Sequence, residues 1–334
     1  MTSPKKKWSL GKKIGVGVLS FFGVLVLVIG LLVVIKPWAP EIVVADAGPT
    51  GRRVTDNGMI ANYYPAPGPG RHPTVVVVGG SDGGIGRQVD RTAQALQKEG
   101  YTALALSYWG AEGQPEIMDR IPLETFRTAF DWVLAQPEVD PERFAFIGTS
   151  KGGEAAVLLA SQTPEFKAVV GYVPSHVVWA GFNLREPWKW NQTGSTWSSG
   201  GQDVPYVPYI QDFRGGPMVD MYVRSWHENL PQHQDAIIPI ENSRAPLLLI
   251  CGEQDTLWPS CDMSREVQKR AAQHDGPTVS VLAYPEAGHM ISGPPADPDH
   301  PFDATQMGGT KEGSDYALSD SWPKVLEFLR AELG

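Results

Sequence analysis

Apolar and polar positions along most of this chain follow the periodicities of strands and helices. The segment TVVVV at 74–78 is a continuous apolar run, as is typical of a strand buried on both faces. The same patterns predict strands at 74–78, 101–107, 143–148, 166–173, 246–251 and 278–284, and helices at 87–99, 123–136, 151–161, 262–273 and 320–333. Because such alternation builds right-handed βαβ units, we expect an α/β fold with a doubly wound, mostly parallel sheet.

One segment, at about 174–244, interrupts this alternation. It has little periodicity but is rich in aromatic residues: Trp179, Phe182, Trp188, Trp190, Trp197, Tyr206, Tyr209, Phe213, Tyr222 and Trp226. Long irregular segments are usually functional or disordered, and disordered ones are poor in aromatic residues. We therefore expect a folded cap above the carboxyl ends of the strands. Its aromatic side chains would supply apolar walls to a site at that edge or pack the cap onto the body.

The N-terminal region contains a different pattern. Residues 14–35 form a run of 22 residues without a charge. At about 1.5 Å per residue, this run is long enough to cross a hydrocarbon core of about 30 Å. A cleaved signal peptide is the alternative, because Ala45-Asp46-Ala47 resembles a cleavage site. However, a signal core is usually about 7–15 residues long, which favours an uncleaved signal-anchor.

Lysine residues indicate the orientation of this segment. Lys5, Lys6, Lys7, Lys12 and Lys13 precede it, whereas only Lys36 follows closely. Since positive charge concentrates on the cytoplasmic side, the bias predicts a single-pass protein of the cell membrane with the bulk of the chain extracytoplasmic. The expected organisation is a cytoplasmic tail at 1–13, a transmembrane anchor at 14–35, a polar tether at 36–53 and the α/β domain at 54–334.

Composition and charge exclude one class of partner. The chain has 334 residues and a formal net charge of −9, with 42% hydrophobic and 19% charged residues. This is the balance of a globular protein, and it offers no broad basic face to a nucleic acid. Cys251 and Cys261 are the two cysteines. They are either two small buried apolar residues or, in an exported domain, a disulfide that stiffens the loop between them.

The clearest candidate for chemistry is Gly148-Thr149-Ser150-Lys151-Gly152, a G-x-S-x-G motif. The strand RFAFI leads directly into it and the helical segment EAAVLLAS follows. A nucleophile elbow requires this strand–turn–helix setting, with glycines relieving the crowding of a strained turn. The sequence therefore predicts Ser150 as a nucleophile at a helix N-terminus.

A serine nucleophile needs a base and an acid, which follow in the order Asp/Glu and then His in this fold. Asp255 follows the expected strand 246–251, and His289 follows the strand that ends at residue 284. We expect His289 to accept the serine proton and Asp255 to orient the imidazole, with Glu253 as an alternative acid. His176, Trp179 and Trp258 are expected to contact substrate.

The oxyanion of the reaction needs two backbone N–H donors. Lys151, directly after the nucleophile, is expected to provide one. Ser81, in the loop GGSDGG at 79–84, is expected to provide the other, with Gly80 as the neighbouring alternative. Because G-x-G-x-x-G, H-E-x-x-H and Cys/His clusters are absent from the sequence, no cofactor and no metal are expected.

Several segments of the chain resemble the C-terminal catalytic domain of acyl-CoA thioester hydrolases and bile acid-CoA:amino acid N-acyltransferases. The matching segments are GGSDGG at 79–84, LAQPEVDPERFAFIGTSKGGEAAVLLAS at 134–161, YVPSHVVWAG at 172–181, GEQDTLWPS at 252–260, YPEAGH at 284–289 and SWPKVLEFL at 321–329. The resemblance implies an α/β-hydrolase fold and thioester chemistry, and it places the triad on Ser150, Asp255 and His289.

The chain differs from this family in two respects. Family members often have an N-terminal β-sandwich domain, for which the 36–53 tether leaves no room, and the amino-acid-conjugating members have a cysteine where this chain has Ser150. Serine favours transfer to water, so we expect a membrane-anchored serine hydrolase of acyl thioesters or esters.

The alternatives are acyl transfer to another acceptor, a carboxylesterase of envelope lipid esters, a dienelactone-type hydrolase and a catalytically silent binding protein. An exported domain conflicts with a CoA substrate, because CoA thioesters are cytoplasmic.

Overall fold

The computed structural model describes residues 10–189, 192–212, 215–295 and 303–334. The helices are α1 (Leu10–Ile35), α2 (Arg87–Lys98), α3 (Glu124–Leu134), α4 (Lys151–Ala160), α5 (Met218–Asn229), α6 (Ser260–Gln273) and α7 (Lys311–Leu333). The strands are β1 (Arg52–Val54), β2 (Ile60–Tyr64), β3 (His72–Val78), β4 (Thr102–Ser107), β5 (Ile121–Pro122), β6 (Val139–Thr149), β7 (Phe166–Tyr172), β8 (Trp197–Ser199), β9 (Gln202–Asp203), β10 (Leu247–Gly252) and β11 (Val279–Tyr284).

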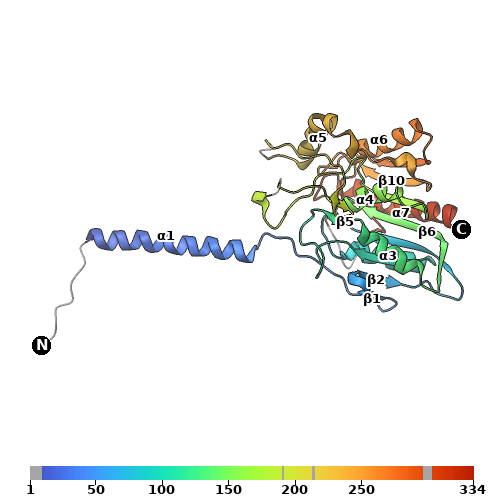
Figure 1. Cartoon of the computed structure of the whole chain (residues 1–334), viewed down its shortest axis with the longest axis horizontal. Helices are drawn as coiled ribbons and strands as arrows, with labels where there is room; N and C mark the ends of the chain where they lie inside the picture. Colours follow the sequence, from blue (N-terminus) through green and yellow to red (C-terminus); the bar gives the residue numbers. More distant parts are fainter. Residues whose placement is uncertain (1–9, 190–191, 213–214, 296–302) are drawn as a thin grey trace.

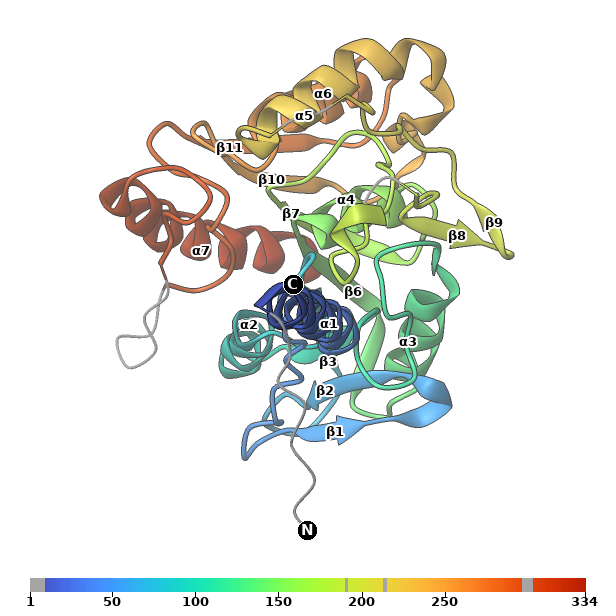
Figure 2. The same ribbon diagram turned by 90° about the vertical axis from the view of Figure 1, so that its left-hand side faces the viewer.

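Eight strands form the central sheet in the order β1-β2-β4-β3-β6-β7-β10-β11. The pairs β1/β2 and β2/β4 are antiparallel, and every other neighbouring pair in this sheet is parallel. Helices α2 and α7 cover one face, and α3, α4 and α6 cover the other (Figure 2). This doubly wound, mostly parallel sheet confirms the fold expected from the sequence.

The elements that the sequence did not reveal have identifiable reasons. β1 and β2 are short strands joined through a turn at Asp56-Asn57-Gly58 and lie at the antiparallel edge of the sheet. Helix α7 begins nine residues before the expected start at Asp320, where the Thr310 hydroxyl accepts a bond from the Gly313 amide at 3.0 Å. Pro323 lies inside this helix. Because proline is more typical of the first turn of a helix than of its interior, it favoured the later start that we expected.

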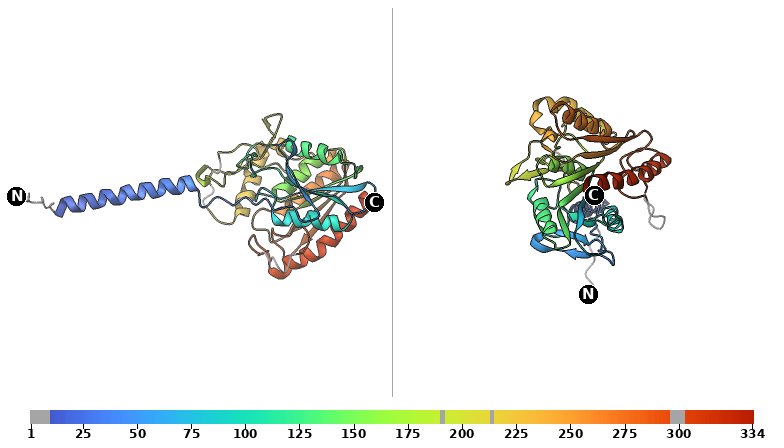
Figure 3. Two further views of the ribbon diagram at one scale, coloured as in Figure 1. Left: turned by 90° about the horizontal axis from the view of Figure 1, so that it is seen from below. Right: turned by 90° about the vertical axis from the view of Figure 1, so that its right-hand side faces the viewer.

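Helix α1 stands apart from the globular body (Figures 1 and 3). Its segment Gly17–Ile35 is long enough and apolar enough to cross a membrane, with a mean hydropathy of 3.2 and no part of it buried against the protein. A signal sequence meets the same criteria of length and composition. Residues 1–9, which include three of the lysines used to predict the orientation, lie outside the described residues.

Part of the segment 36–53, the expected polar tether, is attached to the body. The amide of Ala45 donates to the Ile85 carbonyl at 2.9 Å, and the amide of Ile85 donates to the Val43 carbonyl at 2.8 Å. Gly84 lies so close to this segment that an added Cβ would be 2.2 Å from the Val43 oxygen. The side chains of Ile42 and Val44 pack against the core. The stretch 42–45 of the expected tether therefore packs against the body, a contact that its polar, Pro/Gly-containing composition did not indicate.

The insertion at about 174–244 is folded in its described part. It contains β8, β9, α5 and short 3₁₀ turns, and β8 pairs with β5 from the body. Trp179, Tyr209, Tyr222 and Trp258 form a small apolar core in which the cap packs against the body. Trp190 and Phe213, two of the aromatic residues noted in the sequence, lie outside the described residues.

Candidate active site

Ser150 lies in a sharp turn between β6 and α4. Its backbone has φ 57° and ψ −117°, a left-handed conformation that costs a non-glycine residue about 1–3 kcal/mol. The turn needs both flanking glycines, because an added Cβ on Gly148 would be 1.9 Å from the Gly152 oxygen, and one on Gly152 would be 2.2 Å from the Gly79 oxygen. The motif is therefore required by close backbone packing, and it holds the serine hydroxyl beside the loop at 79–84.

His289 and Asp255 complete a hydrogen-bonded relay with this serine. The His289 Nε2 atom is 2.9 Å from Ser150 Oγ, and His289 Nδ1 is 2.8 Å from Asp255 Oδ2. All three side chains are buried, with exposed fractions of 6% for Ser150, 4% for His289 and 7% for Asp255. These distances are those of a nucleophile, a base and an orienting acid.

Asp255 is held by four further groups or segments of the protein. Its Oδ1 atom accepts from the amides of Leu257 at 2.9 Å and Trp258 at 3.2 Å, and its Oδ2 accepts from the Ser260 hydroxyl at 2.7 Å. The segment 307–309 packs between the loops of Asp255 and His289, and the His289 amide donates to the Met307 carbonyl at 3.1 Å. Glu253, the alternative acid, instead pairs with Arg265 at the surface.

The sequence prediction missed the role of the segment 307–309. Gly308 has φ 90°, and an added Cβ would be 1.9 Å from the Gln254 oxygen; one on Gly288 would be 2.1 Å from the Gly308 oxygen. Only glycine allows this close approach of three loops. The adjacent pair Gly308-Gly309 was the available signal, but it lies outside the expected strands and helices.

The two cysteines are bonded to each other. Their Cα atoms are 5.0 Å apart, and the disulfide joins the end of β10 to the first turn of α6. Asp255 lies in the loop that this bond closes. The bond therefore limits the movement of the segment that carries the acid of the relay.

The loop at 79–84 lies directly against Ser150. The carbonyl of Gly80 accepts from the Tyr108 hydroxyl at 3.0 Å and from Trp109 Nε1 at 3.2 Å. The amide of Gly80 already donates to Asp82 Oδ1 at 3.0 Å. No hydrogen bond among the described residues occupies the amide of Ser81 or of Lys151. Both amides are therefore free to bind a developing oxyanion.

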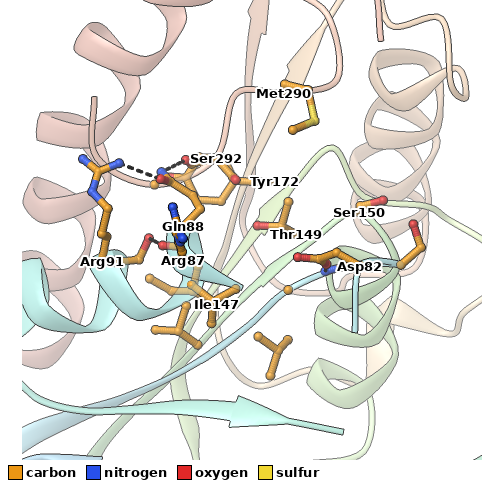
Figure 4. A pocket seen from close by; sticks show the side chains of 18 of the residues that line it. Asp82, Arg87, Gln88, Arg91, Ile147, Thr149, Ser150, Tyr172, Met290 and Ser292 are labelled. Atoms are coloured by element: carbon orange, nitrogen blue, oxygen red, sulfur yellow. Dashed lines mark hydrogen bonds between the residues drawn. The ribbon is translucent and has the colours of Figure 1, made fainter. Parts of the chain in front are cut away.

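A pocket of about 600 Å³ opens at Ser150 (Figure 4). Its apolar lining includes Ala45, Val77, Val89, Ile147, Leu257, Met290 and Met307. Its polar lining includes Asp82, Arg87, Gln88, Arg91 and Ser292. Burial raises the pKa of the Asp82 carboxyl from its ordinary value, and the backbone amides it accepts from oppose this shift. The pocket thus combines an apolar wall with two guanidinium groups.

The structure corrects the expected substrate contacts. No residue of the cap lines this pocket among the described residues, so the prediction that cap aromatics form its wall was wrong. Trp179 donates to Ser175 Oγ at 2.9 Å, and Trp258 donates to the Val173 carbonyl at 3.1 Å. His176 borders a separate cavity between α5 and α6. None of the three is among the residues that line the pocket at Ser150, although the Trp258 ring contacts His289 edge to face with centroids 6.0 Å apart.

The side chain of Lys151 has a structural role that is separate from that of its backbone amide. Its Nζ atom is 2.9 Å from Glu154 Oε2 and 2.8 Å from Thr196 Oγ1, and Glu154 Oε1 accepts from Trp197 Nε1 at 2.8 Å. Burial lowers the pKa of the Lys151 ammonium and raises that of the Glu154 carboxyl, and their mutual attraction opposes both shifts. This buried pair connects the nucleophile helix to the cap.

No group of three or more potential metal-binding side chains occurs among residues 10–189, 192–212, 215–295 and 303–334. The arrangement of the pocket is instead suited to acyl transfer through a serine. Fold and site together define an α/β hydrolase.

Comparison with known proteins identifies the family. Residues 121–334 match the family model described as BAAT / Acyl-CoA thioester hydrolase C terminal, and the chain belongs to this family. Human acyl-coenzyme A thioesterase 1 is 28% identical over 278 residues, which cover 80% of this chain and 62% of the relative. Mouse acyl-coenzyme A amino acid N-acyltransferase 2 is 28% identical over 280 residues, covering 80% of this chain and 62% of the relative. The chain thus spans less than two thirds of the length of these relatives.

Solved structures support the fold. The acylaminoacyl peptidase of Pyrococcus horikoshii superimposes with a TM-score of 0.58 at 17% identity, covering 87% of this chain and 42% of that chain. A dienelactone hydrolase-like promiscuous phosphotriesterase from metagenomic libraries superimposes with a TM-score of 0.51 at 17% identity, covering 85% and 99% of the two chains. At such low identity the likeness concerns the fold alone.

Proposed function

We propose that this chain is a membrane-anchored serine hydrolase that cleaves acyl thioesters or esters through a serine acyl-enzyme. The observation that carries the proposal is the relay from Ser150 through His289 to Asp255 at hydrogen-bonding distances. The family relationship supports acyl chemistry. The strained, buried serine at a helix N-terminus supports its use as a nucleophile rather than as a structural residue.

The relay supports the following reaction. Ser150 Oγ attacks the acyl carbon while its proton moves to His289 Nε2, and Asp255 stabilises the resulting imidazolium. The amides of Lys151 and Ser81 bind the oxyanion of the tetrahedral intermediate. As that intermediate collapses, His289 returns the proton to the departing thiolate or alkoxide. A water molecule, deprotonated by His289, then attacks the acyl carbon; as this second intermediate collapses, His289 returns the proton to Ser150 Oγ and the carboxylic acid leaves.

The side of the membrane determines which leaving group is relevant. The names of the relatives favour a CoA thioester, and Arg87 and Arg91 in the pocket suit an anionic leaving group. The disulfide and the lysine distribution favour an exported domain, where CoA thioesters are absent. Digestion of intact cells by an external protease separates these alternatives, because only an exported domain is cleaved.

The nucleophile is tested with full-length protein in detergent. We expect fluorophosphonate to label the wild type but not Ser150→Ala, and this variant to lose at least about 10³-fold in kcat on acyl-CoA and on a neutral aryl ester. Ser292→Ala is the matched control, because it makes the same change in the same pocket away from the relay. Full activity of Ser150→Ala would refute the proposal. Analysis of the products with added amines would distinguish hydrolysis from acyl transfer.

A further inference from the structure

Three exposed apolar side chains outside α1 lie close to the end of that helix. Six large apolar residues of the described body are highly exposed: Trp38, Val43, Leu184, Trp188, Met218 and Tyr316. Trp38 and Trp188 contact each other edge to face with ring centroids 5.7 Å apart, and Trp38 Nε1 donates to the Arg185 carbonyl at 3.1 Å. Trp38, Leu184 and Trp188, here called the tryptophan patch, are 40%, 44% and 50% exposed.

The tryptophan patch lies where the chain leaves the candidate membrane span. Trp38 is three residues after Ile35, the end of that span, so their Cα atoms are at most about 11 Å apart. The polar interfacial layer on each side of a bilayer is about 5–8 Å thick. With α1 across a bilayer, Trp38 therefore lies at or just beyond this layer. Figure 1 shows the cap segment around residue 185 beside the end of α1.

Contacts on both sides of the patch hold it at this position. Lys36 Nζ is 3.5 Å from Glu186 Oε1, which links the end of α1 to the cap. Farther along, the bonds between the 43–45 segment and Ile85 attach the chain to the body. The body consequently cannot turn the patch away from the end of α1 without breaking these contacts.

The chemistry of the patch fits a lipid surface. Tryptophan is enriched at membrane–water interfaces because its ring is apolar and its N–H is polar. Lys36, Arg185 and Lys189 form ion pairs with Glu116 and Glu186, so three positive charges face two negative ones and the net charge of this group is only +1. The surface therefore lacks a strong positive field, and apolar burial, not anionic lipid, would provide its affinity.

We propose that the tryptophan patch inserts into the boundary between headgroups and acyl chains of the bilayer that α1 spans. This inference rests on the membrane anchoring included in the proposed function. Ala45, which lines the catalytic pocket, is seven residues from Trp38 and so at most about 25 Å away. Insertion would thus hold the catalytic pocket close to the lipid layer, and acyl substrates would enter from that layer.

A site-directed label tests the insertion. Cys251 and Cys261 are bonded to each other, so Leu184→Cys introduces a single free thiol in the full-length protein. After reaction with an environment-sensitive fluorophore, the protein is reconstituted in phosphatidylcholine vesicles. Tyr316→Cys, on α7 and 60% exposed, is the matched control. We expect lipid-attached quenchers to reduce the emission at position 184 several-fold more than at position 316.

Three outcomes would distinguish the alternatives. Equal quenching at both positions, in protein that floats with the vesicles, would overturn the insertion but leave the anchor intact. Failure of the protein to float with vesicles would refute the anchor itself. Protection at position 184 that persists in detergent and grows with protein concentration would identify a second copy of the chain as the partner and also overturn the insertion.

A functional measurement is independent of the label. Trp188→Asp places a charge in the patch, and we expect it to reduce kcat/KM at least about fivefold on a long-chain ester within vesicles. Hydrolysis of a soluble short-chain ester should be unchanged, which shows that the variant is folded. Equal rates of wild type and variant on the vesicle substrate would contradict the inference.

Discussion

The carboxyl edge of the sheet and the cap differ in how they are built and in what they contribute. At the sheet edge, Ser150, Asp255 and His289 are placed by short loops in which backbone atoms approach so closely that only glycine is tolerated. In the cap, large aromatic rings fill space between irregular segments, and none of them lines the catalytic pocket in the described part of the chain. In the proposed mechanism the edge therefore carries the chemistry, while the aromatic side chains of the cap pack a separate apolar core.

The largest expected effect is a loss of kcat when the acid at the sheet edge, Asp255, is replaced. Asp255→Asn keeps an oxygen for the Leu257 and Trp258 amides but puts an NH₂ group, which cannot accept a hydrogen bond from His289 Nδ1–H, opposite the ring, so the imidazole adopts the wrong tautomer. We expect kcat to fall about 10³–10⁴-fold with little change in unfolding free energy. Steady-state kinetics and urea denaturation measure the two quantities.

Glu253→Gln is the control for that variant. Glu253 is the other carboxylate of the same loop, and its partner is the surface residue Arg265. We expect its activity to be close to that of the wild type. If the two variants lost activity equally, the assignment of Asp255 as the acid would be wrong.

The second prediction concerns the buried Lys151–Glu154 ion pair, which connects the sheet edge to the cap. Lys151→Met leaves the buried carboxylate of Glu154 without its ammonium partner, which should cost about 3–5 kcal/mol of unfolding free energy. Adding Glu154→Gln removes the uncompensated charge and retains an acceptor for Trp197. Urea denaturation should therefore show recovery of much of the loss in the double variant. A single variant as stable as the wild type would mean that the pair does not fasten the cap.

The smallest effect lies in the cap. His176 borders a cavity of about 320 Å³, and its Nδ1 atom has no hydrogen-bond partner among the described residues. Burial lowers the pKa of His176 from 6.5 to about 3. Between these values the unfolded chain binds a proton that the folded chain does not, so stability falls as the pH decreases from 6.5 towards 3. The slope approaches about 1.4 kcal/mol per pH unit.

The replacement His176→Phe removes this linkage. Relative to the wild type, the variant should gain about 2 kcal/mol in unfolding free energy when the pH is changed from 7.5 to 5, whatever its stability at pH 7.5. Urea denaturation at a series of pH values measures the difference. Parallel pH profiles for the two proteins would show that His176 is not buried as a neutral group.

The contrast between edge and cap also explains what the sequence could predict. The strand 74–78 and the G-x-S-x-G motif were recognisable because their requirements are local: continuous burial for the strand and backbone crowding for the turn. Asp255 and His289 followed from their order in the chain, their positions directly after predicted strands and the family resemblance. The wall of the pocket was not predictable in this way, because Met307, Met290 and Ala45 meet only through tertiary packing.

The errors have the same origin. Trp179 and Trp258 were expected in the pocket because aromatic rings suit an acyl chain, yet rings of this size also fill a core, and their surroundings decide between the two. The stretch 42–45 gave too short an apolar signal to distinguish a packed segment from a loop. Gly308 acquires its importance only when three distant loops converge.

The attachment of the 43–45 segment beside Ile85 has a mechanical consequence. A hydrolase on a long flexible linker moves through a large volume above the membrane. It therefore meets substrate in the lipid layer only rarely. Here few residues are free between the end of α1 and the first fixed point on the body, so the height of the domain is set by the fold. With α1 in a bilayer, substrate search becomes two-dimensional, and lateral diffusion replaces diffusion through solution. Lengthening the chain at residues 39–41 would allow the domain to move away from the membrane and meet substrate through solution. No atom of Ser150, His289 or Asp255 would be altered.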